Sequence, residues 1–396
     1  MKITQQLSTL ALLILLGMVS CSESDADLSS SPSGSRDSSG SSATTGEDGP
    51  PQNEGLITAG EWNDLDNWDF WKEVIEEEEF SPNDRWGILT TNRVSVQVLD
   101  GSTPMVDVPV DLILDLGQGT PTMTLWSART DNIGRAELWM GPYVRDVQFD
   151  LNTLAFSVAG NRSGHRVQLY EEGVITLTGP PSASTSSQFV DLSFIVDATS
   201  SMADELEFIK DDLEDVIKRV EEGNGALDVR TSTVVYRDEG DEYLVMRSDF
   251  TEDLDATLDF IDNQSAGGGG DFPEAVHTGL ETSISQLDWS REARSRIAFL
   301  ILDAPPHEEA QVTESIRNQI KEAARLGIKI IPITASGIDK PTELLMRQMV
   351  ILTNGTYVFI TNDSGIGEDH IEASVGEYEV EFLNDLMVRL IKKYTD

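Results

Sequence analysis

The segment FIVDATSSMADE, residues 194 to 205, places oxygen-bearing side chains directly after an apolar run. Asp197 ends the run, and Thr199 and Ser201 follow within four positions. Oxygen ligands that converge where a strand passes into a helix suit a hard divalent cation such as Mg²⁺. The same residue types also cap helices, because their side chains accept hydrogen bonds from free backbone amides. One cap needs only one such residue, so both interpretations stay open at this point.

Similar residues follow the later apolar runs of the chain. Asp303 ends the run IAFLILD, and the second run, STVV, leads into YRD. A glycine-rich loop, GGGGDFPEA, starts at residue 267. A carboxylate at the end of a buried strand is costly unless it meets a cation or good hydrogen-bond donors. Ligands of open α/β sheets bind beyond the carboxyl ends of the strands, so we expect these segments to converge on one edge.

The elements that must position these residues are strands and helices in alternation. Between residue 188 and the end, near-continuous apolar runs alternate with amphipathic stretches, a pattern typical of a parallel sheet covered on both faces. We therefore predict a doubly wound α/β domain. Two helical stripes are clear, the second of them stopped by Gly327. Their residues are Leu206, Ile209, Leu213, Val216, Ile217 and Val220, then Val312, Ile316, Ile320 and Ala323.

Residues 188–396 resemble a von Willebrand factor type A domain, which has a Rossmann-like fold. The residues Asp197-x-Thr199-x-Ser201 match its Asp-x-Ser/Thr-x-Ser signature, and Asp303 matches its later aspartate. The resemblance implies a metal-ion-dependent adhesion site that holds Mg²⁺, with Mn²⁺ or Ca²⁺ as alternatives. It also implies a protein partner whose acidic residue completes the coordination of the ion.

The third position of the family signature is a threonine after paired glycines, and this chain has Asp271 there. Asp271 therefore joins the predicted metal set. Three aspartates would over-neutralise one ion, so we expect Asp271 to cap the following helix, with Glu274 at the capping-box position, and to reach the metal at most through water. We also expect a binding rim around the ion. Its residues are Tyr236, Arg237, Asp238, Gly269, Gly270 and His307.

An all-β sandwich is predicted over residues 91–182. The period changes to two from about Asn92, and five apolar residues from Val106 to Leu114 alternate without a break, as in a half-buried strand. The piece TDNIGRAEL resembles prealbumin-like or carboxypeptidase-regulatory-like sandwiches. Residues 57–90 are interpreted as a short helical connecting segment, with a helix near residues 67–79. Its anchors are Trp62, Trp68 and Trp71.

The N-terminus indicates secretion and lipidation. An apolar segment from Leu10 to Val19 follows Lys2, is too short to span a bilayer and precedes Cys21, the single cysteine. The sequence GMVSC resembles a bacterial lipoprotein box. We therefore expect a signal peptide over residues 1–20, a lipidated Cys21, and a disordered tether over residues 21–56. The expected location is the bacterial cell envelope, with a lipid anchor in the outer membrane and the domains periplasmic or surface-exposed.

Charge and missing motifs narrow the function. Acidic residues outnumber basic ones 70 to 28, for a net charge of -42, which excludes nucleic acid as a partner because phosphate binding needs a basic surface. HEEAQ lacks the second histidine of a zinc protease, GxSxG is absent, and GGGGD lacks the Lys-Ser/Thr of a phosphate loop. We predict a binding protein and not an enzyme. A structural module with a vestigial metal site and a metal-assisted hydrolase remain the alternatives.

Overall fold

The computed structural model describes residues 57–77, 80, 85–117, 121–223, 227–362 and 371–396. The predicted signal peptide, Cys21 and the tether lie outside these ranges. Among the helices within them, none is long and apolar enough to cross a membrane.

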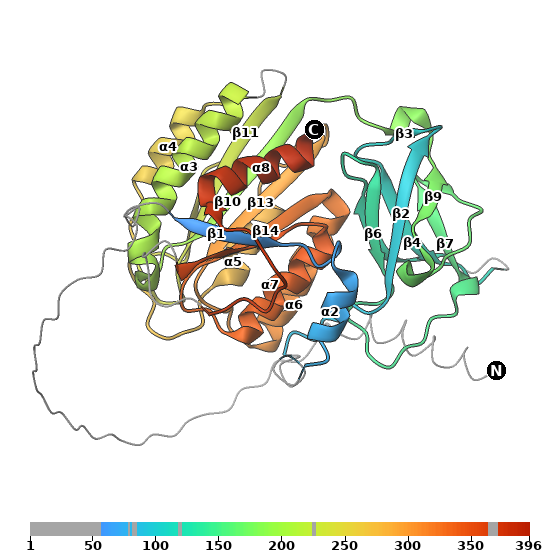
Figure 1. The fold of residues 1–396 in the computed structure, drawn as a ribbon, viewed down its shortest axis with the longest axis horizontal. Coiled ribbons are helices and arrows are strands. Elements are labelled where there is room, and N and C mark those ends of the chain that lie inside the picture. Colours follow the sequence, from blue (N-terminus) through green and yellow to red (C-terminus); the bar gives the residue numbers. More distant parts are fainter. Residues whose placement is uncertain (1–56, 78–79, 81–84, 118–120, 224–226, 363–370) are drawn as a thin grey trace, which may run out of the picture. The chain divides into compact units, whose positions relative to one another are not determined.

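An eight-stranded mixed sheet forms the centre of the larger part of the chain (Figure 1). Its order is β12-β11-β10-β13-β14-β15-β1-β16. Five neighbouring strands are parallel, namely β11 (Asp228–Tyr236), β10 (Phe189–Asp197), β13 (Ser295–Leu302), β14 (Ile328–Thr334) and β15 (Tyr357–Ile360). The antiparallel strands at the two ends are β12 (Val245–Arg247), β1 (Thr58–Trp62) and β16 (Glu381–Phe382). The predicted alternation of parallel strands and helices is confirmed for this domain.

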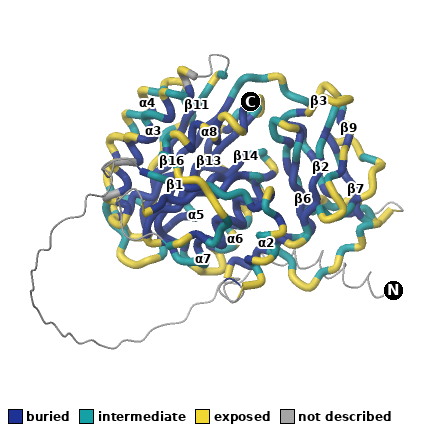
Figure 2. The backbone as a smooth tube through the Cα atoms, in the orientation of Figure 1, coloured by how far each residue is buried: buried dark blue, intermediate teal, exposed yellow. Residues whose placement is uncertain are grey.

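The parallel strands are apolar along their whole length because both faces of the sheet are covered. Every residue of β13 is buried, and the central strands run through the dark interior of Figure 2. On one face, Phe194 of β10 stacks on Phe299 of β13 with ring centroids 5.7 Å apart. The neighbouring residue Ile195 faces the other layer, where it approaches Gly279.

Helices cover both faces of the sheet in the described part of the chain (Figure 1). One layer holds α3 (Ala203–Gly223), α4 (Leu254–Asp262) and α8 (Leu383–Thr395); the other holds α5 (Val276–Glu281), α6 (Ala310–Leu326) and α7 (Lys340–Thr353). Both predicted apolar stripes are confirmed, since every residue of each is buried. Helix α6 ends at Gly327, whose φ of 72° lies in the left-handed region that glycine adopts without a steric penalty.

The segment before the β-rich region is part of this domain and not a connection. Residues predicted as a helical connector begin with strand β1, which pairs with β15 at the sheet edge. Helix α2 (Trp68–Val74) is shorter than the predicted helix and buries Trp68 and Trp71. A fully buried ion pair fastens the segment to α7, because the Arg347 guanidinium donates to both oxygens of Asp64 at 2.6 and 2.9 Å. The sequence pattern missed β1 because its partner strand lies almost 300 residues away.

Two four-stranded sheets lie between residues 93 and 178. One contains β3 (Thr103–Pro104), β2 (Arg93–Asp100), β6 (Arg135–Trp139) and β9 (Ile175–Thr178). The other contains β5 (Met123–Arg129), β4 (Pro109–Leu114), β7 (Leu154–Val158) and β8 (Asn161–Arg162). Val94, Val96 and Val98 are completely buried, as the alternating pattern predicts.

The predicted unbroken strand from Val106 to Leu114 is interrupted. Strand β4 begins only at Pro109, because Asp107 has a φ of 57° and so leaves the extended conformation. The buried Asp107 carboxylate accepts hydrogen bonds from Arg129 at 2.5 and 2.7 Å. It also accepts one at 2.8 Å from Arg296, near the start of β13. This ion cluster joins the small sheets to the large one, which a local sequence pattern cannot reveal.

Replacing Asp107 by Asn should lower the free energy of unfolding by roughly 3 kcal/mol, because it leaves the buried Arg296 without a charged partner. Asn tolerates the positive φ, so the change tests the charge and not the backbone. Urea unfolding of the full chain measures the loss. The matched control, Asp111→Asn on β4, should change stability by less than about 0.5 kcal/mol. Equal midpoints for both variants would contradict this role of Asp107.

Candidate functional site

The topology brings the predicted aspartates to one crevice. Strand β10 lies between β11 and β13. The strand that follows β10 in sequence, β11, lies on one side of it, and β13 later lies on the opposite side. This reversal opens a crevice at the carboxyl ends of β10 and β13, where ligands of such sheets bind. Asp197 is the last residue of β10, and Asp303 follows directly after β13. The structure therefore places both carboxylates at adjacent strand ends.

The Asp197 carboxylate is fully buried and only half satisfied. Its Oδ1 accepts hydrogen bonds from the backbone amide of Thr199 at 2.9 Å and from the Thr199 hydroxyl at 2.7 Å. The Thr199 hydroxyl lies 3.2 Å from the Ser201 hydroxyl. Within the described residues the second oxygen, Oδ2, accepts no hydrogen bond of good geometry, although a weaker interaction with the Tyr236 hydroxyl opposes the rise in the pKa of Asp197. Three of the predicted ligands thus lie together, with a free carboxylate oxygen among them.

Asp303 is in the same situation on the neighbouring strand. Its side chain is buried, and within the described part of the chain its Oδ1 has no partner. Burial raises the pKa of Asp303, the negative charge of Asp197 raises it further, and a hydrogen bond from Ser201 opposes both effects. Burial likewise raises the pKa of Asp197. Both carboxylates are therefore stabilised by gaining either a proton or a cation.

The glycine-rich loop packs against this strand end. The Ser200 hydroxyl donates to the Gly268 carbonyl at 2.6 Å, and the Gly267 amide donates to the Ala198 carbonyl at 2.9 Å. Gly269 has a φ of 66°, and a Cβ atom there would lie 2.7 Å from Oε1 of Glu274. A side chain at residue 269 would therefore fill space that the site uses.

The predicted role of Asp271 as a helix cap is wrong. Helix α5 starts at Val276, with Ala275 at the N-cap position, and Asp271 is exposed on the loop. Glu274 is not in a capping box but almost completely buried, with its amide donating to the Pro305 carbonyl at 2.9 Å. The helix starts later than predicted because the loop continues past Pro273 to place Glu274 inside.

Glu274 is a site residue that sequence reasoning missed. Its Oε2 lacks a hydrogen-bond partner in the described ranges. Burial raises the pKa of Glu274 to about 9, with further contributions from the negative charges of Asp197, Asp238 and Asp303. No local pattern indicated this burial, because it depends on the packing of the loop against Pro305.

A second buried acid, Glu205 in the first turn of α3, was also missed. It accepts a hydrogen bond from the Ser336 hydroxyl, while its Oε2 has no partner in the part of the chain that the structure describes. Its negative charge contributes to the raised pKa of Asp303. The crevice is therefore more acidic than the sequence motif alone suggests.

Two residues predicted for the rim are buried beneath it. Tyr236 is completely inaccessible, and burial together with the charges of Asp197 and Asp303 raises its pKa well above the ordinary value. Arg237 is almost as buried; its guanidinium donates to the Ser265 carbonyl at 2.8 Å and lies 4.3 Å from the ring centre of Tyr243. Neither side chain is exposed to solvent as a rim residue would be.

The remaining rim residues reach the surface to different degrees. Nε2 of the half-buried His307 lies 2.7 Å from Oδ1 of Asp238, which is itself buried. Burial lowers the pKa of His307, but the Asp238 carboxylate outweighs it and the net shift is upward. Gly269 is half-buried and Gly270 is exposed. Next to them, Phe272 exposes 47% of its surface, which adds an apolar side chain that we did not predict.

These residues fit a hydrated magnesium ion better than a metal held by many charged ligands. Across the described ranges, no three His, Cys, Asp or Glu side chains are grouped closely enough to hold a metal ion. Mg²⁺ keeps several waters and needs only one or two carboxylates, which Asp197 and Asp303 could supply. The hydroxyls of Thr199 and Ser201 would add neutral ligands. The two unpartnered carboxylate oxygens are the observation that supports this fit.

The match to a family model agrees with this fold. Residues 191–361 match the von Willebrand factor A domain family, so such a domain is present. Over 131 residues, 33% of this chain and 12% of the relative, the chain is 28% identical to a protein named as an ariadne-like RING finger protein, R811, of Acanthamoeba polyphaga mimivirus. Over 126 residues, 32% of this chain and 20% of the relative, it is 32% identical to alpha-protein kinase vwkA of Dictyostelium discoideum.

The chain thus spans less than a quarter of either relative. Among solved structures, the crystal structure of the conserved hypothetical protein BatB from Bacteroides thetaiotaomicron is similar over 52% of this chain and 98% of that chain. The sequence identity is 13% and the TM-score is 0.35.

Because the pKa of Glu274 is raised, we expect the Glu274→Gln variant to be more stable than wild type by an amount that depends on pH. The folded wild-type chain holds the Glu274 proton up to about pH 9, whereas the unfolded chain releases it near 4.5, so rising pH between these values destabilises the fold. Without metal, the variant should be more stable than wild type by about 1–3 kcal/mol at pH 8 and nearly equal at pH 4.5.

Urea unfolding in the presence of chelator measures this difference. The matched control is Glu252→Gln, which neutralises an exposed carboxylate and should follow wild type at every pH. A Glu274→Gln stability gain that is the same at pH 4.5 and pH 8 would show that ionisation of Glu274 is not its cause.

Proposed function

We propose that this protein binds a protein partner through a divalent cation held at the carboxyl edge of the large sheet. Asp197 and Asp303 supply the charged ligands and Thr199 and Ser201 the neutral ones, with Mg²⁺ as the ion and Mn²⁺ or Ca²⁺ as alternatives. The observation that carries the proposal is a pair of buried aspartate oxygens at adjacent strand ends, neither of which has a hydrogen-bond partner in the described part of the chain. A bound cation would offer an open position to an acidic side chain of the partner.

Charge supports a metal-dependent contact. At a net charge of -42 the protein repels acidic groups, and the ionised forms of Asp197 and Asp303 add negative charge at this edge. A divalent cation between Asp197 and Asp303 would neutralise them and let an acidic partner approach. Gly270, Asp271 and Phe272 are exposed beside the crevice and would form the contact surface around the ion. We infer that the edge binds its partner without catalysing a reaction.

The proposed setting is the bacterial cell envelope. A lipid on Cys21 would anchor the chain to the outer membrane, with the domains periplasmic or surface-exposed, and the Ser- and Gly-rich residues 21–56 would separate them from the bilayer. We further propose that the two four-stranded sheets between residues 93 and 178 pack as the β-sandwich that the sequence predicts. It would act as a rigid mount for the binding domain, because Asp107 joins it to β13.

Mg²⁺ affinity should depend on Asp303 much more strongly than on Asp271. Asp303→Asn removes one of two charged ligands and should lower the affinity for Mg²⁺ at least tenfold in calorimetric titration. Asp197→Ala should have the same effect. Asp271→Asn, a change of the same type on the exposed loop, should keep most of the affinity. An equal loss in Asp271→Asn and Asp303→Asn would make Asp271 a direct ligand, and the partner-carboxylate mechanism would then need replacing.

Capture of envelope proteins tests the function itself. Wild-type protein should retain a partner in Mg²⁺ and release it in chelator, while Asp303→Asn retains none and Asp271→Asn still does. If the partner were retained both in chelator and by the Asp303→Asn variant, a structural module with a vestigial site would be favoured. Turnover of a phosphoester or peptide that requires Asp303 would instead favour metal-assisted hydrolysis.

Lipidation makes a separate prediction. Cys21→Ser should abolish labelling by a radioactive fatty acid and release the protein from membranes into the soluble fraction, because no second cysteine can take the acyl chains. Ser20→Thr, a small change next to the same site, serves as the control and should remain labelled. Persistent labelling of Cys21→Ser would exclude Cys21 as the lipid site.

A further inference from the structure

A cavity lies at the opposite end of the parallel strands from the metal edge. Its volume is about 170 Å³, and its walls come from the turn between β5 and β6, from Asn63, from Asn354 at the end of α7, and from Lys393 and Tyr394 at the end of α8. Asn354 follows α7 just before β15, so the cavity is at the amino ends of the strands. It therefore shares no residue with the crevice of Asp197 and Asp303, and holds more than a single water molecule.

Two basic side chains in this wall have no acidic partner. The backbone amide of Arg135 donates to Oδ1 of Asp131 at 2.8 Å, but among the described residues its guanidinium has no ion-pair partner and its buried Nε has no acceptor. Lys393 is exposed, and within the described ranges its ammonium contacts only the ring of Tyr394, at 5.6 Å. By contrast, the neighbouring Arg93 is paired with Glu137 at 2.8 Å. A guanidinium with a buried, unsatisfied donor lacks an acceptor that a ligand could supply.

The acids of the wall are already used or face the solvent. Glu137 accepts from Arg93 and from the Ser95 hydroxyl, both at 2.8 Å. Asp131 accepts from two backbone amides of its own turn and from the Asn354 side chain at 3.1 Å. The remaining acid, Asp66, is exposed. None of them is placed to neutralise Arg135.

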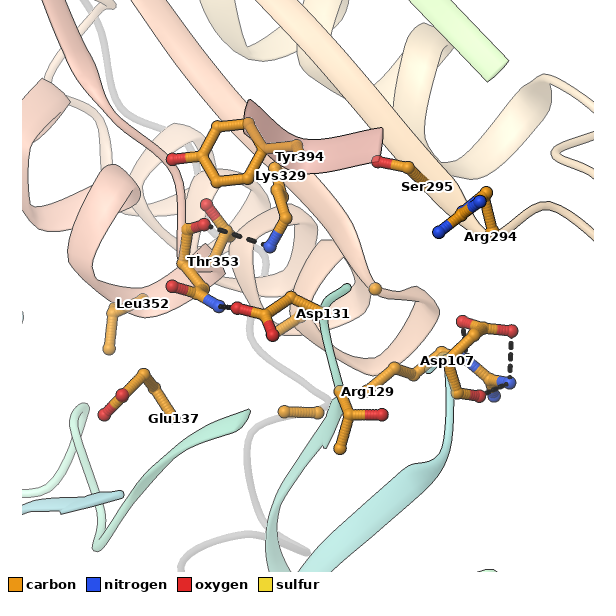
Figure 3. A pocket seen from close by; sticks show the side chains of 15 residues that line it. Asp107, Arg129, Asp131, Glu137, Arg294, Ser295, Lys329, Leu352, Thr353 and Tyr394 are labelled. Atoms are coloured by element: carbon orange, nitrogen blue, oxygen red, sulfur yellow. Dashed lines mark hydrogen bonds and ion pairs between the residues drawn. The ribbon is translucent and has the colours of Figure 1, made fainter. Parts of the chain in front are cut away.

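A smaller cavity of about 20 Å³ adjoins the first and shares Asp131, Glu137, Asn354 and Tyr394 with it. Figure 3 shows Lys329 reaching toward the space beside Asp131 in this second cavity. Within the described ranges the buried Lys329 ammonium donates to the Asn354 carbonyl at 3.2 Å and lies 4.8 Å from the ring centre of Tyr394. The larger cavity has three basic and three acidic side chains in its wall, a more balanced charge than in the whole chain, where acids prevail 70 to 28. Since the acids are paired, hydrogen-bonded or exposed, the cations Arg135 and Lys393 leave this place locally favourable to an anion.

We propose that the cavity between the β5–β6 turn and the end of α8 binds a small organic anion with a carboxylate or phosphate group. The Arg135 guanidinium would donate two parallel hydrogen bonds to the anionic group, since its planar fork matches either group. Lys393 would close over it from the exposed side, and Lys329 would contribute positive charge from behind. The volume admits a ligand of few heavy atoms, and not a nucleotide or a peptide.

Calorimetric titration of the full-length protein in chelator, with inorganic phosphate and with succinate, tests this site. The chelator removes divalent ions, so no anion can bind through the metal edge. At least one probe should bind at one site with a dissociation constant on the order of 1 mM, as a ligand of few atoms allows. Arg135→Gln and Lys393→Gln should each lower the affinity for the probe about tenfold or more. Binding of phosphate without binding of succinate would indicate that the natural ligand carries a phosphate group.

Two controls separate this proposal from general charge and from the proposed metal site. Lys321→Gln removes an exposed cation on α6 and should leave the affinity unchanged. Asp303→Asn should also bind the probe as wild type does, whatever becomes of its Mg²⁺ affinity. Lys393→Gln is exposed and should fold even where Arg135→Gln does not. The proposal would be overturned if neither probe produced binding heat. It would also be overturned if Lys393→Gln and a folded Arg135→Gln both bound the probe with the wild-type affinity.

Discussion

Two buried carboxylates at the ends of neighbouring strands are the constraint around which this domain is organised. Asp197 and Asp303 lie where the chain reverses its winding direction, and each keeps one oxygen without a hydrogen-bond partner among the described residues. Burying such a group is unfavourable unless a cation or a proton compensates its charge. Glu274 and Glu205 add two more buried acids to the same region. The cation that we propose would compensate this buried charge and stabilise the arrangement.

The glycine-rich loop and the strand order serve this constraint together. The loop can approach β10 because Gly268 and Gly269 adopt positive φ angles and carry no side chain. It then delivers Glu274 to the interior and leaves Asp271 outside. The exposed part of the loop is therefore accessible, while its buried part places Glu274 in the crevice. One short segment thus connects the proposed ion site to the surface.

Elements that depend on local periodicity could be predicted from the sequence. Features that depend on contacts between distant residues could not. The parallel strands and the stripes of α3 and α6 follow from spacing alone, and the edge positions of Asp197 and Asp303 follow from the rule that ligands collect at carboxyl ends. Strand β1 could not be predicted, since it pairs with β15 and is fastened by the distant Arg347. Asp107 breaks its alternating strand because Arg296 stabilises it there. Glu274 matched a capping pattern, although the loop carries it inside.

The family match covers residues 191–361, yet the domain in this protein extends beyond them. Strands β1 and β16 extend the sheet, and helix α8 covers one face. The most direct test of the account is anomalous X-ray diffraction from crystals of the protein grown with Mn²⁺. We predict a single strong peak between the Asp197 and Asp303 carboxylates that disappears in Asp303→Asn crystals. A Mn²⁺ peak elsewhere with this crevice empty, or the same peak in Asp303→Asn, would contradict the claim that the two aspartates form a metal site.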